Sequence, residues 1–140
     1  MNLFRRLFGK RPKPPAPGEQ AAAILHRFTT ATIVGVDRED LGRYPAKQRK
    51  VMAFHYGAIR CLAREFELDE TETLAVFVMF VNRYFNLPVS ETGSISERLQ
   101  GFEENPEEHR YLAAGEDVFR RWHEQGERRA PLELGEMLQE

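Results

Sequence analysis

Residues 74–85 read LAVFVMFVNRYF, and the first eight of them carry no polar side chain. Just before this stretch, Asp69 and Glu72 have the spacing of a capping box, in which each side chain accepts a hydrogen bond from the backbone N–H of the other residue. Pro88 cannot continue a helix, so the pattern predicts a helix over about residues 70–86. Apolar side chains cover most of its circumference, which indicates a central helix buried among other helices. The run is too short to cross a membrane, which takes about 20 apolar residues.

Four other segments show the spacing of apolar side chains that is typical of helices. They cover residues 19–36, 45–66, 106–125 and 130–140. Pro45 suits the first turn of the second segment, and Asn105 followed by Pro106 is a typical helix start. The sequence therefore predicts an all-α fold: a small bundle of four main helices around the central helix at about 70–86, with a short C-terminal helix.

Three segments carry weaker helical signals. Residues 37–44, DREDLGRY, are polar and contain a glycine, which predicts a loop. Residues 89–102 predict a second loop, with one short helical turn at 96–100. The β-branched run TTATIVGV at 29–36 allows a frayed or strand-like end of the first helix.

The first 18 residues differ in composition from the rest of the chain. They contain five basic and no acidic residues, whereas the whole chain has a net charge of −2, so the remainder is acidic. The opening MNLFRRLFGKR is amphipathic as a helix, with Leu3, Phe4, Leu7 and Phe8 on one face and Arg5 and Arg6 on the other. The following RPKPPAPG favours an extended spacer. The predicted organisation is a basic amphipathic peptide at 1–10, a proline-rich linker at 11–18 and a helical domain at 19–140.

This N-terminal peptide is open to three interpretations. As a membrane anchor, its apolar side chains enter the lipid interface while its basic residues meet anionic head groups. As a linear motif, it folds as a helix into the groove of a protein partner. As a structural segment, it folds back onto its own domain or forms a disordered start. The partner predicted for residues 1–11 is therefore a protein or an anionic membrane surface.

A stripe of basic residues follows one face of the second helix, and we call it the basic stripe. It consists of Arg49, Lys50, Arg60 and Arg64. These side chains could bind phosphate groups or an acidic partner, although a solvated charged face is the more common situation. The acidic body of the chain would repel a nucleic-acid backbone, so nucleic-acid binding through the stripe is the weaker alternative.

His55 is the polar residue placed most centrally in the apolar arc of the second helix. In a pocket it could act as a base, a ligand or a pH-sensing group, but a core histidine with a hydrogen-bond partner is more common. A pocket at this position would be lined by His55, Tyr56, Asn82, Arg83 and Tyr84. Cys61 is the single cysteine, which excludes an internal disulfide and suits a reducing cytoplasm.

Local motifs of the common enzyme classes are missing from the sequence. It contains no HExxH, CxxC, GxSxG or glycine-rich phosphate loop, so it predicts no catalytic residue, no metal ligand and no cofactor. The sequence favours a non-catalytic accessory or adaptor protein of bacterial type, cytoplasmic and tethered by its N-terminal peptide to a larger assembly or to the inner face of the membrane. The alternative is a small-ligand binder or an enzyme with a pocket near His55 and Arg83. The sequence leaves the oligomeric state open.

Overall fold

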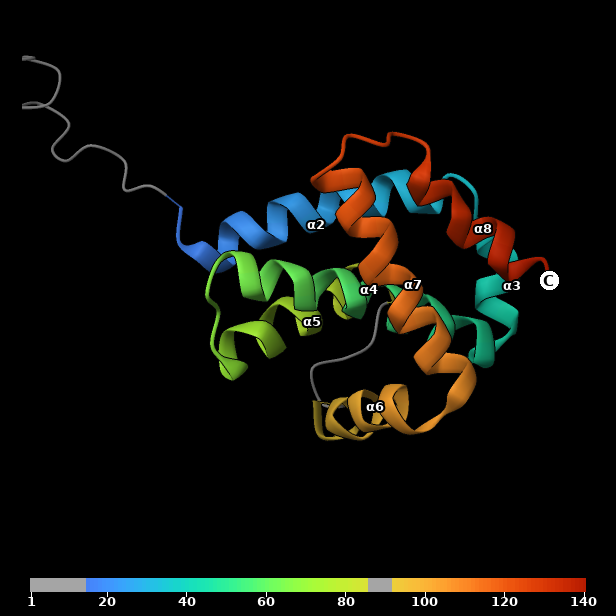
Figure 1. Cartoon of the computed structure of the whole chain (residues 1–140). Helices are drawn as coiled ribbons and strands as arrows, with labels where there is room; N and C mark the ends of the chain where they lie inside the picture. The colour runs from blue at the N-terminus through green and yellow to red at the C-terminus, as the bar shows by residue number, and fades with distance from the viewer. Residues whose placement is uncertain (1–14, 86–91) are drawn as a thin grey trace, which may run out of the picture.

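The computed structural model describes residues 15–85 and 92–140, and every regular element in these ranges is a helix, which confirms the all-α class. Figure 1 shows the elements in chain order. They are α2 (Pro17–Ile33), α3 (Arg38–Arg43), α4 (Pro45–Glu65), α5 (Glu70–Phe85), α6 (Thr92–Glu104), α7 (Pro106–His123), the 3-10 helix η2 (Ala130–Leu132) and α8 (Glu133–Leu138).

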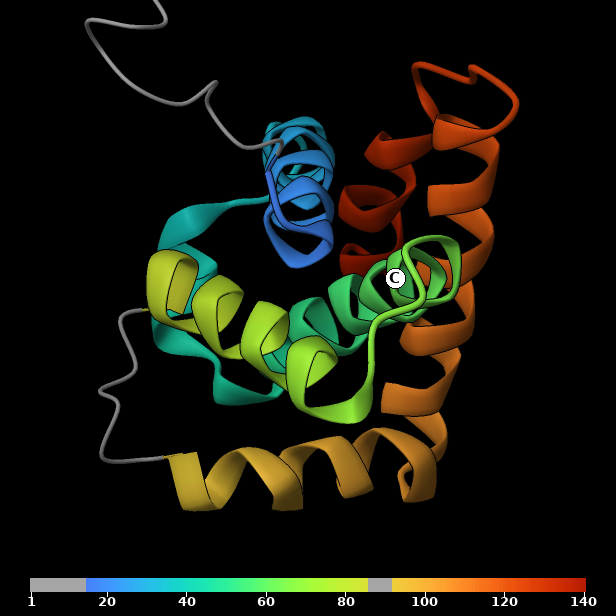
Figure 2. The ribbon, with the colours of Figure 1, turned by 90° about the vertical axis from the view of Figure 1, so that its left-hand side faces the viewer.

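Helix α4 lies at the centre of the domain. It packs against α2, α3, α5, α6 and α7, and Figure 2 shows α2, α6 and α7 on three different sides of it. Ten residues of α4 are buried, compared with four of α5. The segment predicted as the central helix does form a helix, α5, but α4 is the more buried of the two.

Small side chains explain why α4 takes the central place. Its buried face includes Ala53, Gly57 and Ala58, which let neighbouring helices approach from more than one side. Burial of a helix depends on how many neighbours can reach it as well as on its own apolar content. Helix α5 packs through one face and leaves Met79 60% exposed on the other.

A close contact between α4 and α7 depends on two glycines. A Cβ atom added at Gly57 would lie 2.8 Å from the backbone N of Glu116, and one added at Gly115 would lie 2.6 Å from the carbonyl carbon of Phe54. Cβ atoms do not come this close to backbone, so a larger residue at either position would force the two helices apart. The sequence could not tell whether these glycines serve contacts within the chain or between subunits, and the structure places both inside the chain.

Several helix ends follow the local sequence signals. The predicted capping box is present before α5: Glu72 N donates to Asp69 Oδ1 at 2.7 Å, and Asp69 N donates to Glu72 Oε1 at 3.3 Å. At the start of α7, Asn105 Oδ1 accepts hydrogen bonds from the backbone N–H groups of Glu107 and Glu108. These side chains take up amide groups that have no partner within the first turn of a helix.

Residues 37–44 contain a helix where a loop is predicted. The Asp37 carboxylate accepts hydrogen bonds from the backbone N–H groups of Glu39 at 2.9 Å and Asp40 at 3.4 Å, so it caps the short helix α3. An aspartate directly before a helix is a known start signal, and here it outweighs the glycine at position 42. Helix α3 places Arg38 and Leu41 in the lining of a cleft.

The second predicted loop also contains more helix than expected. Helix α6 begins at Thr92 and ends at Glu104, and it buries Ile95 and Phe102 against the core, so it is longer than the single predicted turn. Residues 89–91 of that prediction lie outside the described residues. The β-branched end of the first segment stays helical as far as Ile33, because burial of Thr29 and Thr32 against the core outweighs their low helix propensity.

The C-terminal segment is an integral part of the core. Leu134 is fully buried and Ala130 nearly so. Helix α8 approaches the turn after α2 so closely that a Cβ atom added at Gly135 would overlap the backbone of Gly35. The short C-terminal helix is present as predicted, and it closes the side of the domain next to α2.

Candidate functional site

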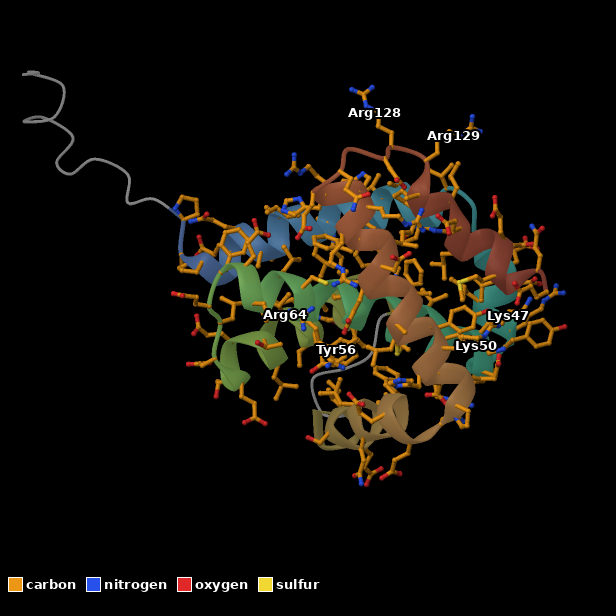
Figure 3. All side chains as sticks on the ribbon, in the orientation of Figure 1. Lys47, Lys50, Tyr56, Arg64, Arg128 and Arg129 are labelled. Atoms are coloured by element: carbon orange, nitrogen blue, oxygen red, sulfur yellow. The ribbon has the colours of Figure 1, made fainter. Side chains whose placement is uncertain are left out.

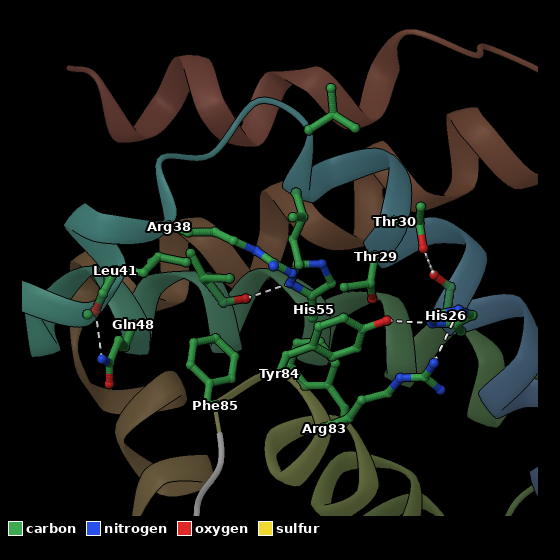
Figure 4. A pocket seen from close by; sticks show the side chains of 15 residues that line it. His26, Thr29, Thr30, Arg38, Leu41, Gln48, His55, Arg83, Tyr84 and Phe85 are labelled. Atoms are coloured by element: carbon green, nitrogen blue, oxygen red, sulfur yellow. Dashed lines mark hydrogen bonds between the residues drawn. The ribbon is translucent and has the colours of Figure 1, made fainter.

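A cleft of about 760 Å³ opens between α2, α3, α4 and α5. Figure 4 shows it from close by, with side chains of all four helices pointing into it. Its apolar walls are made by Ile33, Val34, Leu41, Val51, Phe80 and Phe85. Its polar lining consists of His26, Thr29, Thr30, Arg38, Gln48, His55, Arg83 and Tyr84, together with Gly42. Among the residues that the structure describes, no aspartate or glutamate lines this cleft.

His55 forms part of the inner wall and is fully buried. Its Nδ1 lies 2.8 Å from the carbonyl oxygen of Val51, and its Nε2 lies 2.8 Å from Thr32 Oγ1. A carbonyl oxygen can only accept, so Nδ1 carries the proton, and Nε2 shares the single proton of the Thr32 hydroxyl with the carbonyl oxygen of Thr29, which lies 2.9 Å from the same Oγ1. Burial lowers the pKa of His55 from 6.5 to about 4, because the charged ring would lose its hydration. The histidine is therefore neutral at pH 7.

The pair of Thr32 and His55 resembles a hydroxyl nucleophile next to its general base, with the Val51 carbonyl orienting the ring. The threonine, however, is 0% exposed and is absent from the lining of the cleft. A substrate in the cleft could not reach its hydroxyl group. The pair thus satisfies buried polar atoms in the core, which is the more common role for such a histidine.

A second histidine reaches the cleft from α2. His26 Nδ1 lies 2.5 Å from Tyr84 Oη, and His26 Nε2 lies 3.5 Å from an Nη atom of Arg83. The Tyr84 hydroxyl donates to Nδ1 or accepts from it according to the ring tautomer, and the longer contact turns the guanidinium group of Arg83 toward Nε2.

The structure brings together three of the five residues predicted to line a pocket. His55, Arg83 and Tyr84 line the cleft. Tyr56 points elsewhere and packs with its ring 5.2 Å from Phe77, and Asn82 is exposed outside the cleft. The angular position on each helix explains the difference, because Tyr56 and Asn82 are one residue, or about 100°, away from positions that face the cleft.

His26 and Arg38 are cleft residues that the sequence did not single out. His26 lies on the polar face of its helix, and Thr30 four residues later shares that face, which is a weak sign of a polar surface with a role. Arg38 fell in a segment predicted as a loop. His26 and Arg38 reach the cleft because α2 packs against α5 and α3 packs against α4, and this packing cannot be read from the sequence pattern.

The basic stripe lies beside α6 and α7 and meets acidic side chains there. Arg60 is 2.9 Å from Glu103 and 3.3 Å from Glu116. The other stripe residues also approach carboxylates: Arg64 is 3.9 Å from Glu116, Arg49 is 3.9 Å from Glu108 and Lys50 is 3.8 Å from Glu107. Figure 3 shows Lys50 and Arg64 along α4, whereas Arg128 and Arg129 project from the loop after α7. The stripe thus has a role within the chain, which is to bridge α4 to α6 and α7.

The residues predicted to dock to a membrane or a partner lie in the N-terminal peptide, outside the described residues. In residues 15–85 and 92–140, no group of three His, Cys, Asp or Glu side chains is arranged to hold a metal ion. None of the helices that the structure describes is both long enough and apolar enough to span a membrane. No protein-family model, no curated protein and no solved structure matches the chain.

Proposed function

We propose that this chain is a non-catalytic binding protein whose helical domain holds a small ligand in the cleft between α2, α3, α4 and α5. One observation supports this proposal: the cleft joins apolar walls to polar side chains that converge from all four helices. Its volume of about 760 Å³ is in the range of small-molecule sites, which are mostly apolar with a few polar groups that orient the ligand.

The two threonine hydroxyls of the cleft wall donate to backbone carbonyls, which disfavours either of them as a nucleophile. Thr29 Oγ1 donates to the carbonyl of Leu25, and Thr30 Oγ1 donates to that of His26. The thiol of Cys61 is not part of the cleft lining, and burial raises its pKa, so it stays protonated at neutral pH. A hydroxyl nucleophile would need a base within hydrogen-bond reach, and neither threonine has one.

The proposal is tested by filling the cleft. Thr30 is exposed on the cleft wall, so Thr30→Trp should occupy the space that a ligand would use. We expect the neutral dye N-phenyl-1-naphthylamine to bind the full-length chain and to fluoresce more strongly when bound. The affinity of the Thr30→Trp variant for the dye should be lower by about tenfold or more. A titration with the dye excited in its own absorption band measures both affinities.

Ala23→Trp is the matched control, because Ala23 is exposed on the same helix and lies outside the cleft. This variant should bind the dye as the wild type does. Equal binding by both tryptophan variants, or no binding by the wild type, would refute the assignment of the cleft. Far-ultraviolet circular dichroism confirms that each variant keeps its helices.

A second function, attachment through the N-terminal peptide, is supported by its composition and by where the domain begins. Residues 1–18 hold five basic and no acidic residues beside an amphipathic set of apolar ones. Helix α2 begins at Pro17, and the cleft starts about 14 Å further along it, at His26, given the rise of about 1.5 Å per residue. The peptide and the cleft can therefore act independently.

We expect the full-length chain to co-sediment with vesicles that contain anionic lipid, and a variant lacking residues 1–14 to remain in solution. Each basic residue near an anionic surface contributes about 1 kcal/mol, so binding should weaken as salt is raised. Replacing both Phe4 and Phe8 with serine should also reduce binding, because the apolar side chains enter the interface. If the shortened variant sediments as the full chain does, the peptide is not a membrane anchor.

A further inference from the structure

The arginines of the cleft differ from those of the basic stripe in their surroundings. Arg60 and Arg64 in the stripe lie within 4 Å of carboxylates. Arg38 and Arg83 form no ion pair with any carboxylate that the structure describes, although both line the cleft. In a chain with more acidic than basic residues, two arginines in one cleft whose described lining holds no carboxylate give that cleft a local excess of positive charge, although Asp37 and Glu39 flank Arg38 in the sequence.

The two arginines approach the cleft from different walls. Arg38 comes from α3 and Arg83 from the last turn of α5, and Figure 4 shows Arg38 extending into the cleft toward His55 while Arg83 is turned toward His26. Arg83 also lies with its guanidinium carbon 5.8 Å from the centre of the Tyr84 ring. A planar guanidinium group suits the paired oxygens of a carboxylate or phosphate, and the tyrosine hydroxyl is a further hydrogen-bonding group in the same place.

Apolar surface lies directly beside these donors. The rings of Phe80 and Phe85 are 5.9 Å apart between their centres, and both line the cleft. Ile33, the last residue of α2, and Val34, which follows it, also line the cleft, and Val34 is 78% exposed. An exposed valine at the mouth of a cleft leaves apolar surface that a ligand would cover. The cleft thus presents positive charge and apolar surface to the same ligand.

We propose that the cleft binds a small amphipathic organic anion. Its single carboxylate or phosphate group lies between Arg38, Arg83 and the Tyr84 hydroxyl, and its apolar body packs against Phe80 and Phe85. This inference rests on the proposed binding function and adds the chemical class of the ligand. The charge of the cleft also disfavours the basic N-terminal peptide of the chain as its occupant, because like charges would meet.

The test compares decanoate with decanol, which have the same chain length and differ in the charge of the head group. At pH 7.5 and below its micellar range, decanoate should bind the full-length chain about tenfold more tightly than decanol, as measured by displacement of N-phenyl-1-naphthylamine. In the double variant Arg38→Gln and Arg83→Gln, the two affinities should become nearly equal through a loss of decanoate binding alone. Decyl phosphate, as a third ligand, identifies which oxyanion the site prefers.

Arg43→Gln is the control, because Arg43 lies on the same short helix as Arg38 and does not line the cleft. It should keep the preference for decanoate. If decanol binds as well as decanoate to the wild type, or if the double variant keeps the preference, the anion inference is overturned while the binding function stands. If neither compound nor the dye binds, the binding function itself is wrong. Thermal unfolding of each variant shows that it is folded.

Discussion

Replacing Gly115 with alanine should destabilise the domain by about 3 kcal/mol. The added methyl group would overlap the backbone of Phe54 in α4, and backbone cannot move aside as a flexible side chain can. Helices α4 and α7 would have to separate, and that would loosen the packing of buried side chains such as Leu112 and Phe119. Urea unfolding followed by circular dichroism measures the loss as a lower midpoint.

Gly101→Ala is the matched control for this prediction. Gly101 lies within α6, and a Cβ atom there would be 3.8 Å from Glu108 Oε1, which is an ordinary contact. Alanine has the higher helix propensity, so this variant should gain about 0.5 kcal/mol. The two glycine-to-alanine substitutions should thus change the free energy of unfolding in opposite directions. Equal effects would show that α4 and α7 are not in the close contact described above.

Lowering the pH from 7 to 4 should remove on the order of 3 kcal/mol of stability through His55 alone. Its pKa is about 4 in the folded protein and has the ordinary value of 6.5 once the chain unfolds. Protons therefore bind the unfolded state more readily across this interval, and the stabilisation is complete above pH 6.5 and declines as the pH falls through 4. The cause is the cost of burying a charged imidazole ring.

The variant His55→Leu isolates this effect from that of other titrating groups. Between pH 7 and pH 4, the free energy of unfolding of this variant should fall by about 3 kcal/mol less than that of the wild type. His109→Leu is the control, because His109 is exposed on α7 and its replacement should leave the pH dependence unchanged. Parallel stability curves for the wild type and His55→Leu would contradict the buried, neutral state of this histidine. Urea midpoints at several pH values supply the curves.

The helices could be predicted where local chemistry determines them. The capping box at Asp69 and the asparagine cap at Asn105 act within one turn, so the starts of α5 and α7 were visible in the sequence. Helix α3 was missed because its capping signal at Asp37 competes with a glycine and a polar composition. The relative burial of α4 and α5 was also missed, because close approach at Gly57 is a property of two helices together.

The cleft could be predicted only in part, for a related reason. The sequence placed His55, Arg83 and Tyr84 in one pocket, since a central histidine and the polar edge of an apolar helix both stand out in a single segment. His26 and Arg38 belong to segments whose positions, α2 against α5 and α3 against α4, are set by tertiary packing. The absence of carboxylates among the described lining residues is likewise a property of the assembled site, and it suggests the class of ligand.

The most direct test of the binding function is to map where a ligand binds. In ¹H–¹⁵N spectra of the full-length chain titrated with decanoate, we expect the largest shifts at the backbone amides of Thr30, Gly42 and Tyr84, which come from three of the helices around the cleft. If the shifts of all three amides follow one binding curve with the same dissociation constant, they report a single site. Shifts concentrated instead around Arg60 on the basic stripe, or no shifts at all, would contradict the assignment of this cleft as the functional site.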